Sequence, residues 1–124
     1  MDIIKLHRTF FSLLQSGLWG YGNKELSIFP LTEVEWEGLY RLSREQTVTG
    51  LIFAGIQKLP ENIQPKENLL VRWIATVDAI ERRNVRMNSV LVELYGMFKK
   101  IGLNPVLLKG QGIASLYSNP LLRE

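Results

Sequence analysis

Apolar residues recur at steps of three and four between residues 67 and 101, and the rest of the chain is organised around this stretch. Such spacing places the side chains on one face of an α-helix. The stripe consists of Leu70, Trp73, Val77, Ile80, Asn84, Met87, Leu91, Leu94, Phe98 and Ile101. No proline interrupts the stretch, so the pattern predicts one unbroken helix about 50 Å long. A helix of that length cannot bury its stripe alone, and the remaining segments must pack against it.

Two amphipathic segments open the chain. Asp2 is suited to cap a first helix that continues through Ser16 and stops at Gly17. Thr32 and Glu35 form a capping-box pattern, in which the hydroxyl accepts from a backbone N–H and the carboxylate reaches back to the cap. We expect this second helix to end near residue 44 or 45.

A third helix is predicted over about residues 47–59, ended by Leu59-Pro60. It contains Gly50 and Gly55. Glycine weakens a helix by about 0.8–1 kcal/mol relative to alanine, so we expect these two residues to allow a neighbouring helix to come close. Residues 61–65 form a short polar connection to the long helix.

The chain after the long helix has a different pattern. Gly102 and Asn104 break the helix before Pro105, and the short apolar run 106–108 predicts a buried β-strand. Residues 113–117 predict a short helix. The expected fold class is therefore mainly α, a helical bundle around one long helix, with one short C-terminal strand and helix. Residues 1–102 would form a helical domain, and residues 103–124 would begin a second core.

Composition excludes several classes of protein. Apolar residues make up 46% and charged residues 22%, which is typical of a folded globular protein. The net charge of +3 is too small for the basic surface of a dedicated nucleic-acid binder. The chain has no cysteine and only one histidine, His7, so it offers no protein-built zinc site. Since it shows neither a signal peptide nor a membrane span, we expect a cytoplasmic protein without a membrane partner.

The candidate for binding chemistry is the turn at residues 109–112. A glycine-containing turn at the start of a helix presents backbone N–H groups to an anion, and Lys109 adds a cation. Gly110 and Gly112 would let a phosphate approach the backbone. The segment is not a P-loop, because it lacks the Gly-x-x-x-x-Gly-Lys-Ser/Thr pattern. From this pattern alone, an ordinary turn between a strand and a helix is the interpretation we favour.

The long helix itself offers two further interpretations. Its stripe could form a coiled-coil dimer in which Asn84 sets the register, or it could be the core seam of a bundle. The bundle and a monomeric chain are the interpretation we favour. Arg72, Arg83 and Arg86 lie near one side of the helix and could meet a phosphate. Because acidic residues are interspersed with them, a solvated basic face is the interpretation we favour.

The segment from Gly102 to Arg123 resembles an uncharacterised family of bacterial nucleotidyltransferases, within the polymerase-β-type superfamily. In that family a Leu-Leu-Lys-Gly strand and turn precede a short helix that ends in Tyr-x-x-Pro, followed by an arginine. The corresponding residues are Leu107-Leu108-Lys109-Gly110, then Tyr117 to Pro120, then Arg123. The resemblance is specific over this last fifth of the chain.

The resemblance implies nucleotide transfer from an NTP to an acceptor with Mg²⁺ in the full-length protein. The implied phosphate-binding residues are Lys109, Gly110, Gln111, Gly112 and Arg123. Lys109 departs from the wider superfamily, which has the glycine of a Gly-Ser pair there. The Asp-x-Asp that holds the metals would follow Glu124, so we expect an N-terminal fragment with no catalytic or metal-binding residue and no bound cofactor. A non-enzymatic helical interaction module, dimeric through the long helix, is the alternative.

Overall fold

The computed structural model describes residues 2–23 and 25–124, and in these ranges the chain is mainly helical with no β-strand. Its α-helices are α1 (Ile3–Trp19), α2 (Glu33–Glu45), α3 (Thr49–Ile56), α4 (Glu67–Lys100) and α5 (Gln111–Ala114). The described residues also form short 3₁₀ turns: η1 (Leu26–Ile28) between α1 and α2, η2 (Glu61–Ile63) between α3 and α4, and η3 (Pro120–Leu122) after α5.

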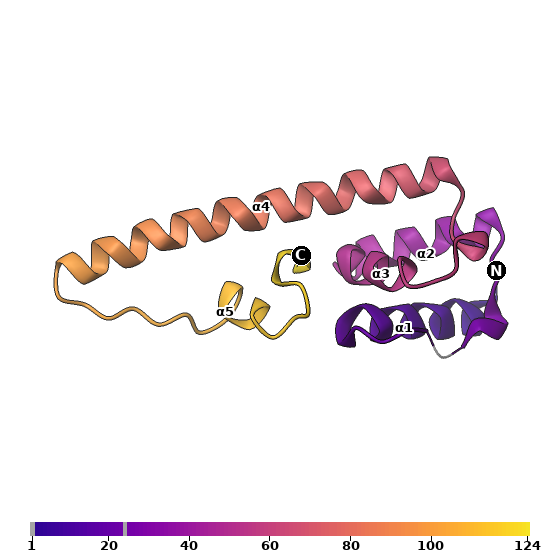
Figure 1. Ribbon diagram of the computed structural model, residues 1–124, viewed down its shortest axis with the longest axis horizontal. Helices are drawn as coiled ribbons and strands as arrows, with labels where there is room; N and C mark the ends of the chain where they lie inside the picture. Colours follow the sequence, from indigo (N-terminus) through magenta and orange to yellow (C-terminus); the bar gives the residue numbers. More distant parts are fainter. Residues whose placement is uncertain (1, 24) are drawn as a thin grey trace.

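The long helix α4 extends along most of the length of the molecule (Figure 1). α1, α2 and α3 gather beside its N-terminal half. From the far end of α4 the chain returns as an extended segment, passes through α5, and finishes beside α3. The predicted unbroken helix is therefore confirmed, because α4 runs without interruption for 34 residues.

α1 and α3 pack so closely that only glycine fits at two positions of their interface. A Cβ atom added to Gly17 would lie 1.8 Å from the carbonyl oxygen of Leu51, and one added to Gly55 would lie 2.2 Å from that of Leu13. The expectation that Gly55 admits a neighbouring helix is confirmed. Gly50 has a similar role, since its Cβ would lie 3.0 Å from the carbonyl oxygen of Leu122.

The prediction that Gly17 ends the first helix is wrong. α1 continues to Trp19, and Gly20 takes the left-handed conformation that ends it, with φ at 78°. Gly17 instead lies inside the helix, buried against α3. The close contact between the two helices explains its presence, because the position requires the absence of a side chain.

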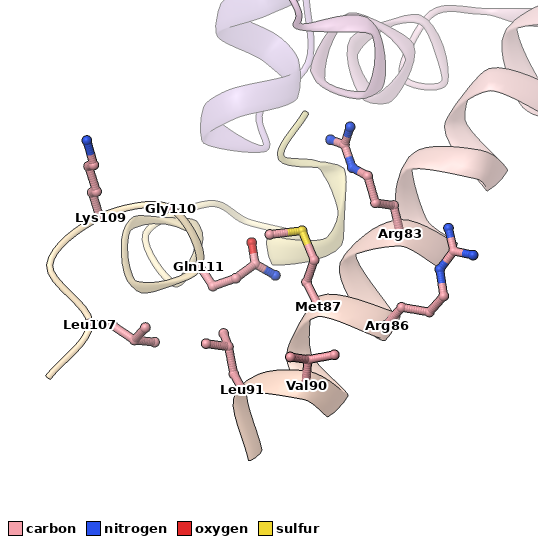
Figure 2. A pocket seen from close by; sticks show the side chains of 9 residues that line it. All are labelled: Arg83, Arg86, Met87, Val90, Leu91, Leu107, Lys109, Gly110 and Gln111. Atoms are coloured by element: carbon pink, nitrogen blue, oxygen red, sulfur yellow. The ribbon is translucent and has the colours of Figure 1, made fainter. Parts of the chain in front are cut away.

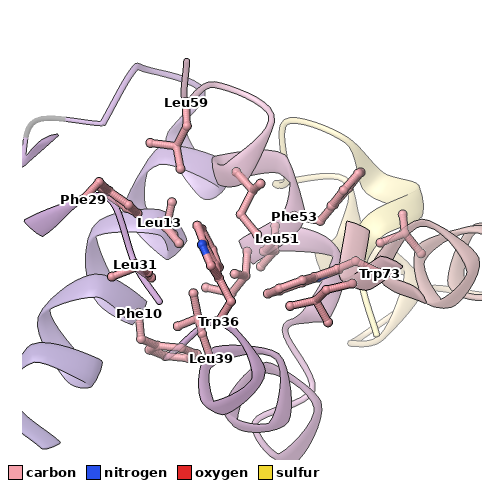
Figure 3. Close-up of a cluster of buried hydrophobic side chains, with 14 of the residues drawn as sticks. Phe10, Leu13, Phe29, Leu31, Trp36, Leu39, Leu51, Phe53, Leu59 and Trp73 are labelled. Carbon is pink, nitrogen blue, oxygen red and sulfur yellow. The ribbon is translucent and has the colours of Figure 1, made fainter. Parts of the chain in front are cut away.

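Trp73 on α4 belongs to the hydrophobic core and lies at one side of the cluster in Figure 3. Its side chain is fully buried, and the indole N–H donates to the carbonyl oxygen of Thr49 at 3.0 Å. The rings of Trp36 and Tyr40 from α2 meet it edge to face, with centroids 6.5 and 5.1 Å away. Such pairs add about 0.5–1.5 kcal/mol to the burial of the rings. Trp73 therefore holds α2, α3 and α4 together.

The capping box predicted at the start of α2 is confirmed. The N–H of Glu35 donates to the hydroxyl oxygen of Thr32, and the Glu35 carboxylate accepts from the backbone N–H of Thr32, each at 3.2 Å. Lys5 of α1 also pairs with this carboxylate at 2.6 Å. The Lys5 hydrogen bond lowers the pKa of Glu35, partly offset by burial, and the bonds from Thr32 lower it further.

Replacing Glu35 with glutamine should reduce the acid sensitivity of the fold. A lowered pKa means that the native state favours the ionised carboxylate. The ionised carboxylate therefore contributes its full stabilisation of the fold at pH values above its ordinary pKa of 4.5. This stabilisation is lost as the pH falls through the lower pKa that the carboxyl group has in the folded protein. Urea unfolding at pH 7 and near pH 3.5 should show a smaller difference for Glu35→Gln than for the wild type. The exposed Glu45→Gln serves as control, and an unchanged difference for Glu35→Gln would contradict the assignment.

Two other expectations need correction. The predicted strand at residues 106–108 is absent: Val106 and Leu108 are 76% and 87% exposed, and neither makes a backbone hydrogen bond within the described residues. A strand requires a neighbouring strand to satisfy its N–H and C=O groups, and the described chain provides none. The third helix is shorter than predicted, at Thr49–Ile56.

Only the first half of the α4 stripe is covered by the bundle. Trp73, Val77, Ile80 and Asn84 are buried, whereas Met87, Leu94, Phe98 and Ile101 are exposed. The accessible surface is 7987 Å², about 1,200 Å² more than the scaling for compact proteins of 14.2 kDa gives. The C-terminal half of α4 and the extended segment after it account for this open surface.

Within the described residues, no helix combines the length and the apolar content needed to cross a membrane.

Candidate functional site

The turn at residues 109–112 depends on the backbone freedom of Gly110. Its φ of 66° and ψ of −117° lie where residues with a side chain are strained. The backbone N–H groups of Gly110 and Gln111 donate to no acceptor within the described chain. α5 has only four residues, so its dipole contributes little. The free N–H groups are therefore what the turn offers to an anion.

Gly112 packs closely against the segment that precedes the turn. Its N–H donates to the carbonyl oxygen of Lys109 at 3.4 Å, so that donor is already used. A Cβ atom at Gly112 would lie 3.1 Å from both the Cβ and the carbonyl oxygen of Leu107. The glycine therefore allows the turn to fold back on the preceding extended segment.

Gln111 and Arg123 tie the turn to the rest of the molecule. The side-chain amide of Gln111 donates to Oδ1 of Asn88 on α4 at 2.8 Å. Its Oε1 accepts from Nη1 of Arg123 at 3.4 Å. A Cβ atom on Gly110 would lie 3.8 Å from Nη2 of Arg123. The structure thus brings Arg123 to the turn, although the two are separated by a helix and several loop residues.

A pocket of about 440 Å³ separates the turn from α4 (Figure 2). The side chains of Met87, Leu91, Leu107 and Gln111 point towards its interior, whereas the ammonium group of Lys109 points away from it. The remaining lining residues are Val90, Gly110, Arg83 and Arg86. The interior is therefore apolar, and positive charge is confined to its rim.

The sequence pattern placed three arginines near one side of α4, but in the structure they have different surroundings. Arg72 pairs with Glu37 at 2.6 Å and lies over the ring of Tyr40, 5.0 Å from its centroid. Arg83 and Arg86 instead border the pocket beside the turn. Their helical spacing was visible in the sequence, but nothing in it showed which of the three would border this pocket.

Four cations near the turn have no acidic partner. Within the described ranges, neither Lys109 nor Arg123, Arg83 or Arg86 forms an ion pair with a carboxylate. Unpaired cations next to free backbone N–H groups favour an anionic ligand, because hydrogen bonds between charged partners are the stronger ones. The arrangement can bind and orient a polyanion such as a chain of phosphates.

The carboxylates needed for a metal ion do not gather in this part of the molecule. No three Asp, Glu or His side chains of residues 2–23 and 25–124 come together in a way that could hold one. Mg²⁺ prefers carboxylate and phosphate oxygens, so the residues described do not fit a magnesium site of their own. Asp78, for example, pairs with Arg82 along the exposed side of α4.

Comparison with known proteins identifies the family. The model of a family described as uncharacterised nucleotidyltransferase matches residues 32–124, which include α2 to α4, the turn and Arg123. A search of curated proteins and a search of solved structures each gave no match. The matched region extends far beyond the C-terminal segment that carried the resemblance. On this evidence the chain belongs to a family of uncharacterised nucleotidyltransferases.

Proposed function

We propose that the turn at residues 109–112 binds the phosphates of an NTP, in an enzyme that transfers the nucleotide to an acceptor. Family membership supports the reaction class. The observation that carries the assignment to this turn is the pair of free N–H groups at Gly110 and Gln111. Lys109 and Arg123 lie beside them, and neither forms an ion pair with a carboxylate of the described residues.

The chemistry of the ligand fits this arrangement. A triphosphate carries several negative charges on oxygens that accept hydrogen bonds, and Arg and Lys donate to such oxygens strongly. Gly110 leaves the approach to the backbone open because it lacks a side chain. In this proposal the turn and Arg123 hold and orient the phosphates, and the long helix supports them through Asn88.

Mg²⁺ is assigned to no residue of this chain. It is the metal expected for nucleotide transfer, where it would screen the charge on the phosphates. The described residues offer no carboxylate cluster for it. The proposed role of residues 109–112 and Arg123 is therefore binding and orientation, without a catalytic residue among them.

Replacing Lys109 or Arg123 with alanine should weaken binding of ATP. Each change removes a cation worth about one charged hydrogen bond, so we expect a five- to tenfold rise in Kd, measured by calorimetric titration of the full chain. Lys58→Ala removes another exposed lysine, just beyond α3, and should leave Kd unchanged. Equal effects of Lys58→Ala and Lys109→Ala would mean that ATP responds only to net charge, and would contradict the proposal.

A second candidate function is a helical interaction module without enzymatic activity. The observation that favours it is the exposed apolar surface on the C-terminal half of α4, which includes Met97, Phe98 and Ile101. Contiguous apolar surface of this kind commonly marks a site of protein contact. The ATP titration separates the two candidates, since a module of this kind would show no saturable binding at the turn.

A further inference from the structure

We infer that Asn84, in the middle of α4, is a positioning residue for nucleotide binding that acts by fixing the backbone of Arg123. The inference rests on the proposed function, because it concerns how the phosphate-binding turn is held. Asn84 does not line the pocket between α4 and the turn. Its effect on a ligand must therefore pass through another residue.

The Asn84 side chain is fully buried and clamps the end of the chain. Its amide nitrogen donates to the carbonyl oxygen of Leu121 at 2.7 Å and to that of Arg123 at 2.6 Å. Two carbonyl acceptors require two N–H donors on one group, which among polar side chains of this size only the amide supplies. Aspartate, leucine or serine at this position would leave at least one of these carbonyl oxygens unpaired.

The Oδ1 atom of Asn84 makes an unfavourable contribution to the stability of the fold. Within the described chain this atom is buried and has no hydrogen-bond partner. An unpaired buried polar atom is unfavourable by about 1–3 kcal/mol. An apolar residue would satisfy the helical stripe without that penalty, since Ile80 and Met87 continue it on either side. The two hydrogen bonds from the Asn84 amide to the C-terminal segment offset this unfavourable contribution.

Neighbouring contacts hold the same segment from the side of α3. Leu122 is buried against Gly50. The carboxylate of Glu124 accepts from the backbone N–H of Thr49 at 3.0 Å and from Arg44 at 3.2 Å. The carbonyl of Arg123 is thus fixed to α4, while the residues on either side of it are fixed to α3. Three anchors leave the Arg123 backbone little freedom.

The fixed backbone determines where the Arg123 side chain can reach. From this position its guanidinium meets Oε1 of Gln111 and lies beside Gly110. Ordering a long side chain costs up to about 2 kcal/mol in rotamer freedom, and that cost rises if the backbone carrying it also moves. Loss of the Asn84 clamp should therefore weaken the contribution of Arg123 to phosphate binding, even though Asn84 touches no ligand.

A double-mutant cycle tests this coupling. ATP binding is measured by calorimetry for the wild type, Asn84→Leu, Arg123→Ala and the double variant, all as the full chain and with folding checked by circular dichroism. We expect Asn84→Leu to raise Kd three- to fivefold when Arg123 is present and by less than 1.5-fold in the Arg123→Ala background. The exposed Asn62→Leu, on η2, should have no effect in either background.

Each outcome of the cycle has a defined meaning. Equal weakening in both backgrounds would show a general structural effect and overturn the inference, as would no weakening in either. Failure of the wild type to bind ATP would instead overturn the proposed function, and this is visible before any Asn84 variant is made. If Asn84→Leu does not fold, Glu124→Gln loosens the neighbouring anchor without creating a cavity. It should then weaken ATP binding only when Arg123 is present, and an effect independent of Arg123 would count against the inference.

Discussion

Replacing Gly17 with alanine should destabilise the protein by at least about 3 kcal/mol, beyond the usual 1–3 kcal/mol for overpacking a core. The added methyl group would lie 1.8 Å from the carbonyl oxygen of Leu51. That neighbour is backbone, so it cannot move aside as the end of a side chain could. α1 and α3 would have to separate, and the separation would expose Leu13 and Ile52, which are now fully buried.

Urea unfolding followed by circular dichroism measures this effect, and Gly96→Ala provides the matched control. Gly96 lies inside α4 with nothing within 4 Å of an added Cβ. Alanine there should stabilise the helix by about 0.5–1 kcal/mol, since only the helix propensity changes. Gly55→Ala, 2.2 Å from the carbonyl of Leu13, should behave like Gly17→Ala. Gly17→Ala and Gly96→Ala variants of equal stability would contradict the close packing of α1 and α3.

Replacing Trp73 with alanine should lower the free energy of unfolding by about 3–5 kcal/mol, the usual cost of truncating a buried aromatic residue. The substitution removes the contacts with Trp36 and Tyr40 and leaves a cavity between three helices. It also leaves the carbonyl oxygen of Thr49 without its indole donor. Because Trp73 joins α4 to α2 and α3, we expect the variant to unfold in a single transition at a lower urea concentration.

Trp73→Phe separates the hydrogen bond from the packing. It retains an aromatic ring but removes the donor to Thr49, so we expect a smaller loss of about 1–2 kcal/mol. The exposed Trp19 gives the control, because Trp19→Ala should change the free energy of unfolding by less than about 0.5 kcal/mol. A Trp73→Ala variant as stable as Trp19→Ala would contradict the stabilising role of Trp73 in the core.

The helices could be predicted from the sequence because their signals are local. The spacing of apolar residues determined the extent of α4, and the Thr32 and Glu35 pair determined the start of α2. The role of Gly17 could not be predicted, because a glycine near the end of a helical pattern is equally suited to end the helix or to admit a neighbour. Only the position of α3 decides between the two.

The partial burial of α4 also depends on the rest of the structure. Val77 and Leu94 both belong to the apolar stripe of α4, but Val77 is buried in the hydrophobic core and Leu94 is exposed. The apolar run at residues 106–108 has the composition of a strand, yet strand formation requires a partner that the described chain does not supply. The local sequence pattern predicts which secondary structure a segment favours. The segments packed against it determine whether that structure forms and which of its residues are buried.

At the candidate site, the sequence identified the turn but not its supports. Lys109 and Gly110 were recognisable from the resemblance, and Gly110 does take the conformation that only glycine accepts easily. Asn84 looked like a polar interruption of an apolar stripe, suited to setting the register of a coiled coil. Its two hydrogen bonds to the C-terminal segment join residues almost forty positions apart, which no local pattern can reveal.

An NMR titration of ATP into the isotope-labelled chain tests the proposed binding of phosphates at residues 109–112 most directly. We predict saturable shifts that are largest at the backbone amides of Gly110 and Gln111 and small at Lys99, Lys100 and Lys58. The absence of shifts at millimolar ATP, or shifts of equal size at all exposed lysines, would contradict the assignment of phosphate binding to this turn.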